Sequence, residues 1–115
     1  MIKTKRGKIE TGLKIKIKEL ASGNEAQVKE LSRLLAQNMK ELQTAIYTSA
    51  ERHNTDAFNH ARHRSKTALS VVGNGRLTEL LSKIDPLFAK KKFDAVAILK
   101  NEIEVAFDEV IRQLS

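Results

Sequence analysis

His63 and Lys66 stand three residues apart in a stretch whose apolar residues recur at helical spacing. Three residues are close to one helical turn, so both side chains lie on the same side of a helix. A rotation of about 100° per residue places His63 opposite the apolar Ala61, so that it faces solvent. A neutral imidazole is a nucleophile that can carry a phosphoryl group on nitrogen, and a lysine one turn away can offset the added negative charge. The pair predicts reversible phosphorylation of His63.

Other polar residues share this stretch and bear on the same chemistry. Cations near an imidazole disfavour the imidazolium and so favour the nucleophilic neutral form. His60 is a rival acceptor because it lies one turn before His63 on the same face, but the residue at its +3 position is a histidine rather than a lysine. The residues expected to surround His63 are His60, Arg62, Arg64, Thr67, Ser70 and Gly73.

A metal site is the main alternative use of these histidines. His53, Asp56, His60 and His63 have spacings at which helical side chains can share one ion. The arginines at 52, 62 and 64 oppose a divalent cation, so we expect no metal. The absence of cysteine excludes a disulfide framework, a thiolate zinc site and a cysteine nucleophile.

No glycine-rich phosphate loop, nucleophile elbow, zinc-protease helix or paired-carboxylate pattern occurs in the sequence. Hydrolases and nucleotide-binding enzymes are therefore unsupported. We expect a protein that is not itself an enzyme and that has no cofactor and no small-molecule substrate.

Four long helices are predicted to position these residues. The first runs from its N-cap Asn24 to about residue 50, and the second from about 55 to 72, with Asn54 or Thr55 as its cap. A Gly-Asn-Gly turn then leads to a third helix, 76 to about 90, and a fourth spans about 93 to 114. Pro86 is expected to kink or break the third helix, or to follow a fresh turn capped by Asp85.

Residues 13–20, with the sequence LKIKIKEL, alternate apolar and basic side chains as a strand does. A lone strand has no partner in an otherwise helical chain, whereas Leu13, Ile17 and Leu20 also fit one face of a helix. We therefore expect a short helix across the end of the bundle. The predicted fold is all-α: an antiparallel four-helix bundle with a short additional N-terminal helix.

The length of the chain limits the number of domains, and its charge is concentrated at one end. The 115 residues suffice for one domain, and the formal net charge is +7. Residues 1–18 contain seven basic side chains and one acidic one, which leaves only +1 for residues 19–115. We expect residues 1–12 to be a basic leader that can be disordered and residues 13–115 to be the helical domain. No apolar run approaches the ~18 residues that span a bilayer, so we expect a cytoplasmic protein without membrane insertion. We expect a monomer, because the apolar stripes of the predicted helices all face inward.

The segment His63-Arg-Ser-Lys66-Thr67-Ala68-Leu69-Ser70-Val71-Val72-Gly73 resembles the signature of histidine-containing phosphotransfer (HPt) domains. In that family, histidine is followed by lysine at +3, a small residue at +4 and glycine at +10. The resemblance covers roughly residues 13 to 114. Residues 19–25 look like the family's entry into its first long helix, and residues 76–81 look like the helix that follows the glycine.

The resemblance implies a phosphorelay intermediate of a two-component system. A receiver domain would pass its aspartyl phosphate to His63, which would pass it to a second receiver. Lys66 would contact the phosphate, Thr67 and Ser70 would keep the surface low around the imidazole, and Gly73 would allow a tight turn. The partners implied are receiver domains of response regulators, and a hybrid sensor histidine kinase is a further partner that the resemblance allows. The receiver would supply Mg²⁺.

Three residues depart from the family pattern. Ser65, Thr67 and Arg62 stand where the family most often has leucine, glycine and alanine. Ser65 removes an apolar contact beneath the site, Thr67 adds bulk where a partner approaches, and Arg62 can attract an acidic receiver face. These departures leave open an adaptor of the same fold that docks on receivers without carrying phosphate. A third hypothesis, a small helical nucleic-acid-binding protein, rests on the basic residues 1–18.

Overall fold

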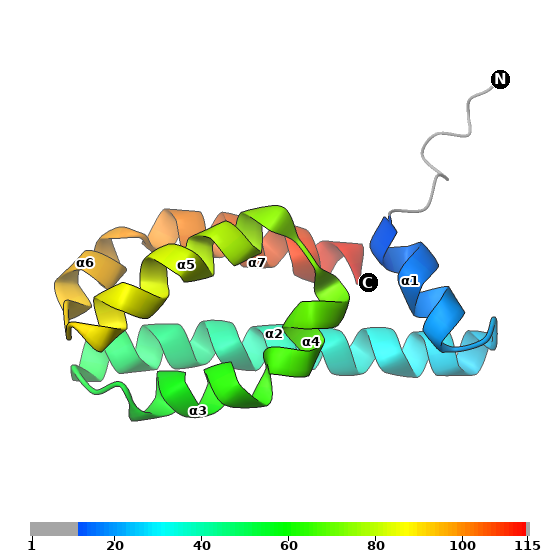
Figure 1. The fold of residues 1–115 in the computed structure, drawn as a ribbon, viewed down its shortest axis with the longest axis horizontal. Coiled ribbons are helices and arrows are strands. Elements are labelled where there is room, and N and C mark those ends of the chain that lie inside the picture. The colour runs from blue at the N-terminus through cyan, green and yellow to red at the C-terminus, as the bar shows by residue number, and fades with distance from the viewer. Residues whose placement is uncertain (1–11, 115) are drawn as a thin grey trace, which may run out of the picture.

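The computed structural model describes residues 12–114, and within that range it is all-helical, as the sequence predicts (Figure 1). The basic leader lies outside the described residues except for Gly12. The helices are α1 (Gly12–Leu20), α2 (Glu25–Arg52), α3 (Asp56–Arg64), α4 (Lys66–Val72), α5 (Gly75–Ala89), α6 (Phe93–Ile98) and α7 (Lys100–Gln113).

The long helix α2 is the central element of the fold. Five other helices pack against it: α1, α3, α4, α6 and α7 (Figure 1). It begins as predicted at Asn24, whose Oδ1 accepts a hydrogen bond of 3.0 Å from the Gln27 amide. α5 packs on α6 and α7. The short helix α1 confirms the helical interpretation of residues 13–20, and it buries Leu13 and Ile17.

The core is a single cluster that draws on every helix. Its fully buried large side chains include Met39, Leu42 and Ile46 of α2, Ile84 and Phe88 of α5, and Phe107 of α7. Phe88 stacks on Phe58 of α3, with 4.3 Å between ring centroids. These rings fix α3 against α5, and they lie beneath the surface that carries His63.

Side chains from outside α3 hold its first turn. Asn54 Oδ1 accepts a hydrogen bond of 2.8 Å from the Asp56 amide. The buried Ser49 of α2 accepts a second bond, also 2.8 Å, from the Phe58 amide. Thr55, the other predicted cap, makes no capping hydrogen bond with its side chain. Two of the free amides at the helix start are thereby satisfied, and α3 is tied to the end of α2.

Two of the four predicted helices are each divided in two, which corrects the sequence prediction. Residues 55–72 form α3 and α4 with Ser65 between them, and residues 93–114 form α6 and α7 with Leu99 between them. Ser65 is buried, with φ −86° and ψ 0°. Helical hydrogen bonds still cross this residue, because the Ser65 amide donates to the Ala61 carbonyl and the Leu69 amide donates to the Ser65 carbonyl, both at 2.8 Å. The break falls between His63 and Lys66.

Pro86 does not break the third predicted helix. α5 continues through it to Ala89, and the Pro86 carbonyl accepts a hydrogen bond of 3.0 Å from the Lys90 amide. Proline has no amide hydrogen, so the hydrogen bond that α5 lacks is the one that residue 86 would donate one turn back, to the Ser82 carbonyl. Asp85 does not cap a fresh turn; its carboxylate instead pairs with Arg62 of α3.

Gly73 ends α4 in the left-handed conformation, with φ +55°. A Cβ at this position would lie 3.2 Å from Lys16 Nζ, which donates a hydrogen bond of 2.8 Å to the Val71 carbonyl. Asn74 then caps α5 by accepting a 2.9 Å hydrogen bond from the Leu77 amide. The Gly-Asn-Gly segment thus makes the tight turn that the sequence predicts.

We expect Gly73→Ala to lower the free energy of unfolding by about 1–2 kcal/mol, because an L-residue is strained at this φ and the methyl group crowds Lys16. Urea denaturation would measure the change. Gly75→Ala is the matched control, since a Cβ there meets nothing within 4 Å. Equal effects of the two substitutions would contradict the assignment of strain to Gly73.

Candidate functional site

The structure places His60 and His63 in two different depressions, although both are exposed on α3. His63 and Lys66 line an open depression between α3 and the carboxyl-terminal end of α5, which we call the His63 depression. His60 and Arg64 line another depression, between α2 and α3. Residues three apart on a helix are offset by about 60° around its axis, and the cleft that each one faces differs accordingly. Lys66 therefore accompanies His63 and not His60.

Arg62 spans the His63 depression and pairs with Asp85. Its Nε and Nη2 donate hydrogen bonds of 3.1 and 2.9 Å to the two carboxylate oxygens of Asp85. The sequence analysis expects Arg62 to attract an acidic partner. In the structure, its guanidinium group already pairs with a carboxylate of the protein itself. The pair also neutralises Asp85, the one carboxylate among the residues that line the depression, so the remaining charge there is positive.

The Arg62–Asp85 pair is expected to contribute a small, salt-dependent stabilisation. A double-mutant cycle with Arg62→Gln and Asp85→Asn should give a coupling free energy of about 0.5–1 kcal/mol at low salt. The effect is modest because the side chains are 33% and 41% exposed. Chemical denaturation of the four proteins measures it. A coupling indistinguishable from zero at low salt would show that the bidentate pair does not join α3 to α5.

Two lysines border the His63 depression. Lys66 opens α4, and Lys91 reaches the depression from the turn between α5 and α6. Within the described part of the chain, neither side chain takes part in an ion pair or hydrogen bond, and both are exposed. Sequence reasoning missed Lys91, because the only signal was the run Lys90-Lys91-Lys92 and the sequence does not show which of the three lines the depression.

The remaining predicted site residues lie on or beyond α4. Thr67 and Ser70 are exposed on α4, and Gly73 is exposed at its end. None of them lines the His63 depression. These three residues therefore lie on the surface of α4 beside the depression rather than in it.

His53 is turned away from the other two histidines. It follows α2 in the left-handed conformation and stacks on Phe93, with 5.2 Å between ring centroids. Its Nε2 lies 4.0 Å from an Asp94 oxygen. Residues 12–114 contain no group of three or more histidines, cysteines and carboxylates that could hold a metal ion. The alternative cluster of His53, Asp56, His60 and His63 is thus not brought together.

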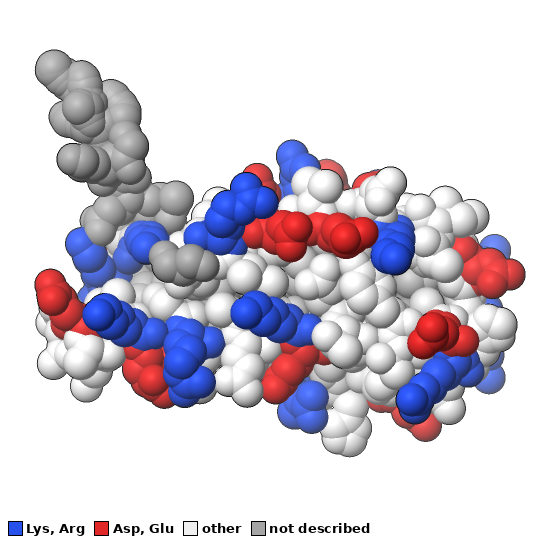
Figure 2. Space-filling view, turned by 180° about the vertical axis from the view of Figure 1, so that it is seen from behind, with Lys and Arg blue, Asp and Glu red and all other residues white. Residues whose placement is uncertain are grey.

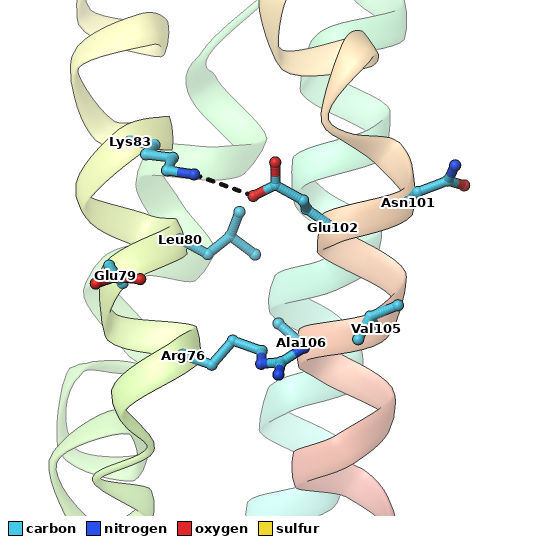
Figure 3. Close-up of a pocket in the computed structure, with 8 residues that line it drawn as sticks. All are labelled: Arg76, Glu79, Leu80, Lys83, Asn101, Glu102, Val105 and Ala106. Carbon is cyan, nitrogen blue, oxygen red and sulfur yellow. Dashed lines mark hydrogen bonds and ion pairs between the residues drawn. The ribbon is translucent and has the colours of Figure 1, made fainter.

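Another open depression lies between α5 and α7 and lacks the chemistry of a phosphoryl acceptor (Figure 3). Lys83 and Glu102 approach each other across it, with 3.2 Å between Nζ and Oε2. Arg76, also on its rim, lies 3.8 Å from Glu109. Lys83, Glu102 and Arg76 are therefore paired, and no histidine lines it.

Charge is distributed unevenly over the surface. On the face drawn in Figure 2, basic side chains gather over the end that carries α1, and acidic and basic side chains are mixed elsewhere. One lysine of α1, Lys16, is already engaged with the α4 carboxyl end. No helix among residues 12–114 has the length and apolar character needed to cross a membrane.

Comparison of the chain with protein-family models, with curated proteins and with solved structures found no match.

Proposed function

We propose that the protein is a phosphohistidine carrier that accepts a phosphoryl group on His63 from a receiver-domain aspartate and passes it to another receiver. The observation that carries this proposal is the exposed His63 in an open depression bordered by Lys66 and lacking an unpaired carboxylate. A carrier histidine must be reachable by a partner's acidic active site, and it must hold a dianionic group once loaded. Exposure serves the first requirement and the lysine serves the second.

The transfer requires little from this chain beyond the nucleophile. The lone pair of the unprotonated ring nitrogen of His63 forms the N–P bond, and the P–O bond to the receiver aspartate breaks with its electron pair leaving on the carboxylate. The proton on the other ring nitrogen stays there or passes to water. The receiver would supply Mg²⁺ and most of the catalytic groups, which is consistent with a site so poor in carboxylates.

The arrangement of the helices supports the same proposal. If α3 with α4 and α6 with α7 are each taken as one interrupted helix, the chain contains four long segments preceded by α1. On this proposal, the four segments correspond to the four-helix bundle with a short N-terminal helix that the sequence analysis expects. His63 lies on the second segment, and the Gly73 turn leads to the third, as in the family pattern.

The test is transfer from purified, phosphorylated receivers of the same genome to the full chain. Phosphohistidine is labile to acid and stable to alkali, so the two treatments distinguish it from phosphoserine and from acyl phosphate. We expect alkali-stable label on the chain with at least one receiver. Absence of label with the complete receiver set would overturn the carrier function.

A second candidate is an adaptor of the same fold that binds receivers without phosphotransfer. The departures of Ser65, Thr67 and Arg62 from the family pattern favour it. Receiver binding without labelling would select the adaptor. Salt-sensitive nucleic-acid binding that is lost on deletion of residues 1–18 would instead select the third hypothesis.

A further inference from the structure

The short helix α1 has exposed apolar side chains that the core does not use. Ile15 is 48% exposed and Leu20 is 58% exposed. The residues that α1 buries are Leu13 and Ile17, each two positions away from Ile15. A rotation of about 100° per residue turns Ile15 to the opposite side of the helix from both. Ile15 therefore faces solvent while the other side of α1 faces the core.

Contacts on its inner side fix α1 in this orientation. It packs on α2 and α4, and Lys16 Nζ donates a hydrogen bond of 2.8 Å to the Val71 carbonyl at the end of α4. Ala21, directly after the helix, is only 4% exposed. The outer side of α1, with Ile15, is thus a defined part of the folded surface.

Positive charge is concentrated at the same end of the molecule. Residues 1–20, which we call the α1 end, contain seven basic and two acidic side chains, a net charge of +5, whereas the rest of the chain contributes only +2. Figure 2 shows basic side chains gathered over α1. The molecule is 50 Å long, and charges in physiological salt are screened over about 8 Å. A ligand at the α1 end therefore meets a basic surface, whatever charges lie at the other end.

From this combination we propose that the α1 end binds the surface of an anionic phospholipid membrane. Each basic side chain near such a surface strengthens binding about fivefold. Ile15 adds an apolar contact at the boundary between the head groups and the acyl chains. The contact is peripheral, because α1 keeps Leu13 and Ile17 in the core and presents only its outer side.

The exposed isoleucine favours a membrane over a nucleic acid. A phosphate backbone attracts the lysines but gains nothing from an apolar side chain among them. Single-stranded nucleic acids are bound by stacking on aromatic rings, and the first aromatic residue of the chain is Tyr47. A membrane surface uses both the charge and the apolar side chain.

Membrane binding goes beyond the carrier function and is independent of it. No residue of α1 lines the His63 depression. His63→Gln should therefore bind vesicles as the wild type does, and failure of one function leaves the other standing.

The test is co-sedimentation of the full chain with lipid vesicles. We expect binding to phosphatidylcholine vesicles that contain about 30% phosphatidylserine, and at least about tenfold weaker binding to pure phosphatidylcholine. Binding to the anionic vesicles should weaken as salt is added, because added ions screen the attraction. Equal binding to the two kinds of vesicle would overturn the proposal.

Ile15→Ser tests the apolar contact. We expect it to weaken binding to the anionic vesicles about three- to fivefold, since roughly half of an isoleucine side chain no longer leaves water. Ile98→Ser is the matched control, because Ile98 is 82% exposed on α6, at the opposite end of the molecule from α1 (Figure 1). Its affinity should stay within about twofold of wild type. Equal effects of the two substitutions would overturn the role of Ile15.

A second pair of variants tests the location of the charge. Lys5→Gln combined with Arg6→Gln should weaken vesicle binding at least about tenfold. Lys90→Gln combined with Lys91→Gln removes the same charge from the α5–α6 turn, and we expect a change within about twofold. Equal losses in the two double variants would contradict binding through the α1 end. Tight binding of a DNA duplex that Ile15→Ser leaves unchanged, without vesicle binding, would overturn the membrane in favour of a nucleic acid.

Discussion

His63→Gln is expected to reduce receiver-dependent phosphorylation of the chain to background, a loss of more than about 1,000-fold. Glutamine has nearly the size and polarity of histidine but no ring nitrogen that can attack phosphorus, and loss of a nucleophile is among the largest single-residue effects in group transfer. His63 is exposed on α3, so the substitution should leave the fold intact. Label on the chain after transfer from a phosphorylated receiver, measured against an equal amount of wild type, tests this.

His60→Gln is the matched control for that variant. It changes the same residue type on the same helix, one turn earlier, but in the depression between α2 and α3. We expect its label to stay within about twofold of wild type, because neither Lys66 nor Lys91 borders His60. Label that persists in His63→Gln and vanishes in His60→Gln would move the acceptor to His60 and would contradict the role given to Lys66.

Phe88→Ala is expected to lower the free energy of unfolding by about 3–5 kcal/mol. Phe88 is 2% exposed, and its ring stacks on Phe58 with 4.3 Å between centroids. Its loss removes apolar contacts and leaves a cavity between α3 and α5. Since small domains are stable by only about 5–15 kcal/mol, this is a large fraction of the total. Urea denaturation provides the measurement.

Ile98→Ala is the control for the Phe88 variant, because Ile98 is 82% exposed. We expect a change within about 0.5 kcal/mol for it. A Phe88→Ala effect below about 1 kcal/mol would mean that the aromatic pair does not hold α3 to α5.

Helix content and helix starts were the most predictable features of the fold. The apolar repeat, the capping side chain of Asn24 and the Gly-Asn-Gly turn are local signals, and the structure has helices where they indicate. The breaks at Ser65 and Leu99 were missed because the apolar repeat runs on through both positions. The sequence left open whether the helix bends at Pro86 or a fresh turn begins there. The structure has one helix through it, with Ile84 and Phe88 on either side buried in the core.

The candidate site could be predicted only where it is local in sequence. His63 and Lys66 lie one turn apart, and the structure keeps them on one depression. Two other features depend on how α5 packs against α3. Arg62 pairs with Asp85, 23 residues later, and Lys91 lines the same depression as His63, 28 residues earlier. Local periodicity carries no information about such separations. His60 and His63 line different depressions, and this too depends on which helices flank α3.

The most direct measurement is a two-step relay with site mapping on the wild-type chain. One phosphorylated receiver is mixed with the chain, a second receiver is added later, and mass spectrometry under alkaline conditions locates the phosphoryl group at each time. We expect phosphate on His63 after the first step and its transfer to the second receiver's aspartate after the second. A folded chain that binds receivers and never carries phosphate at His63 would contradict the carrier function.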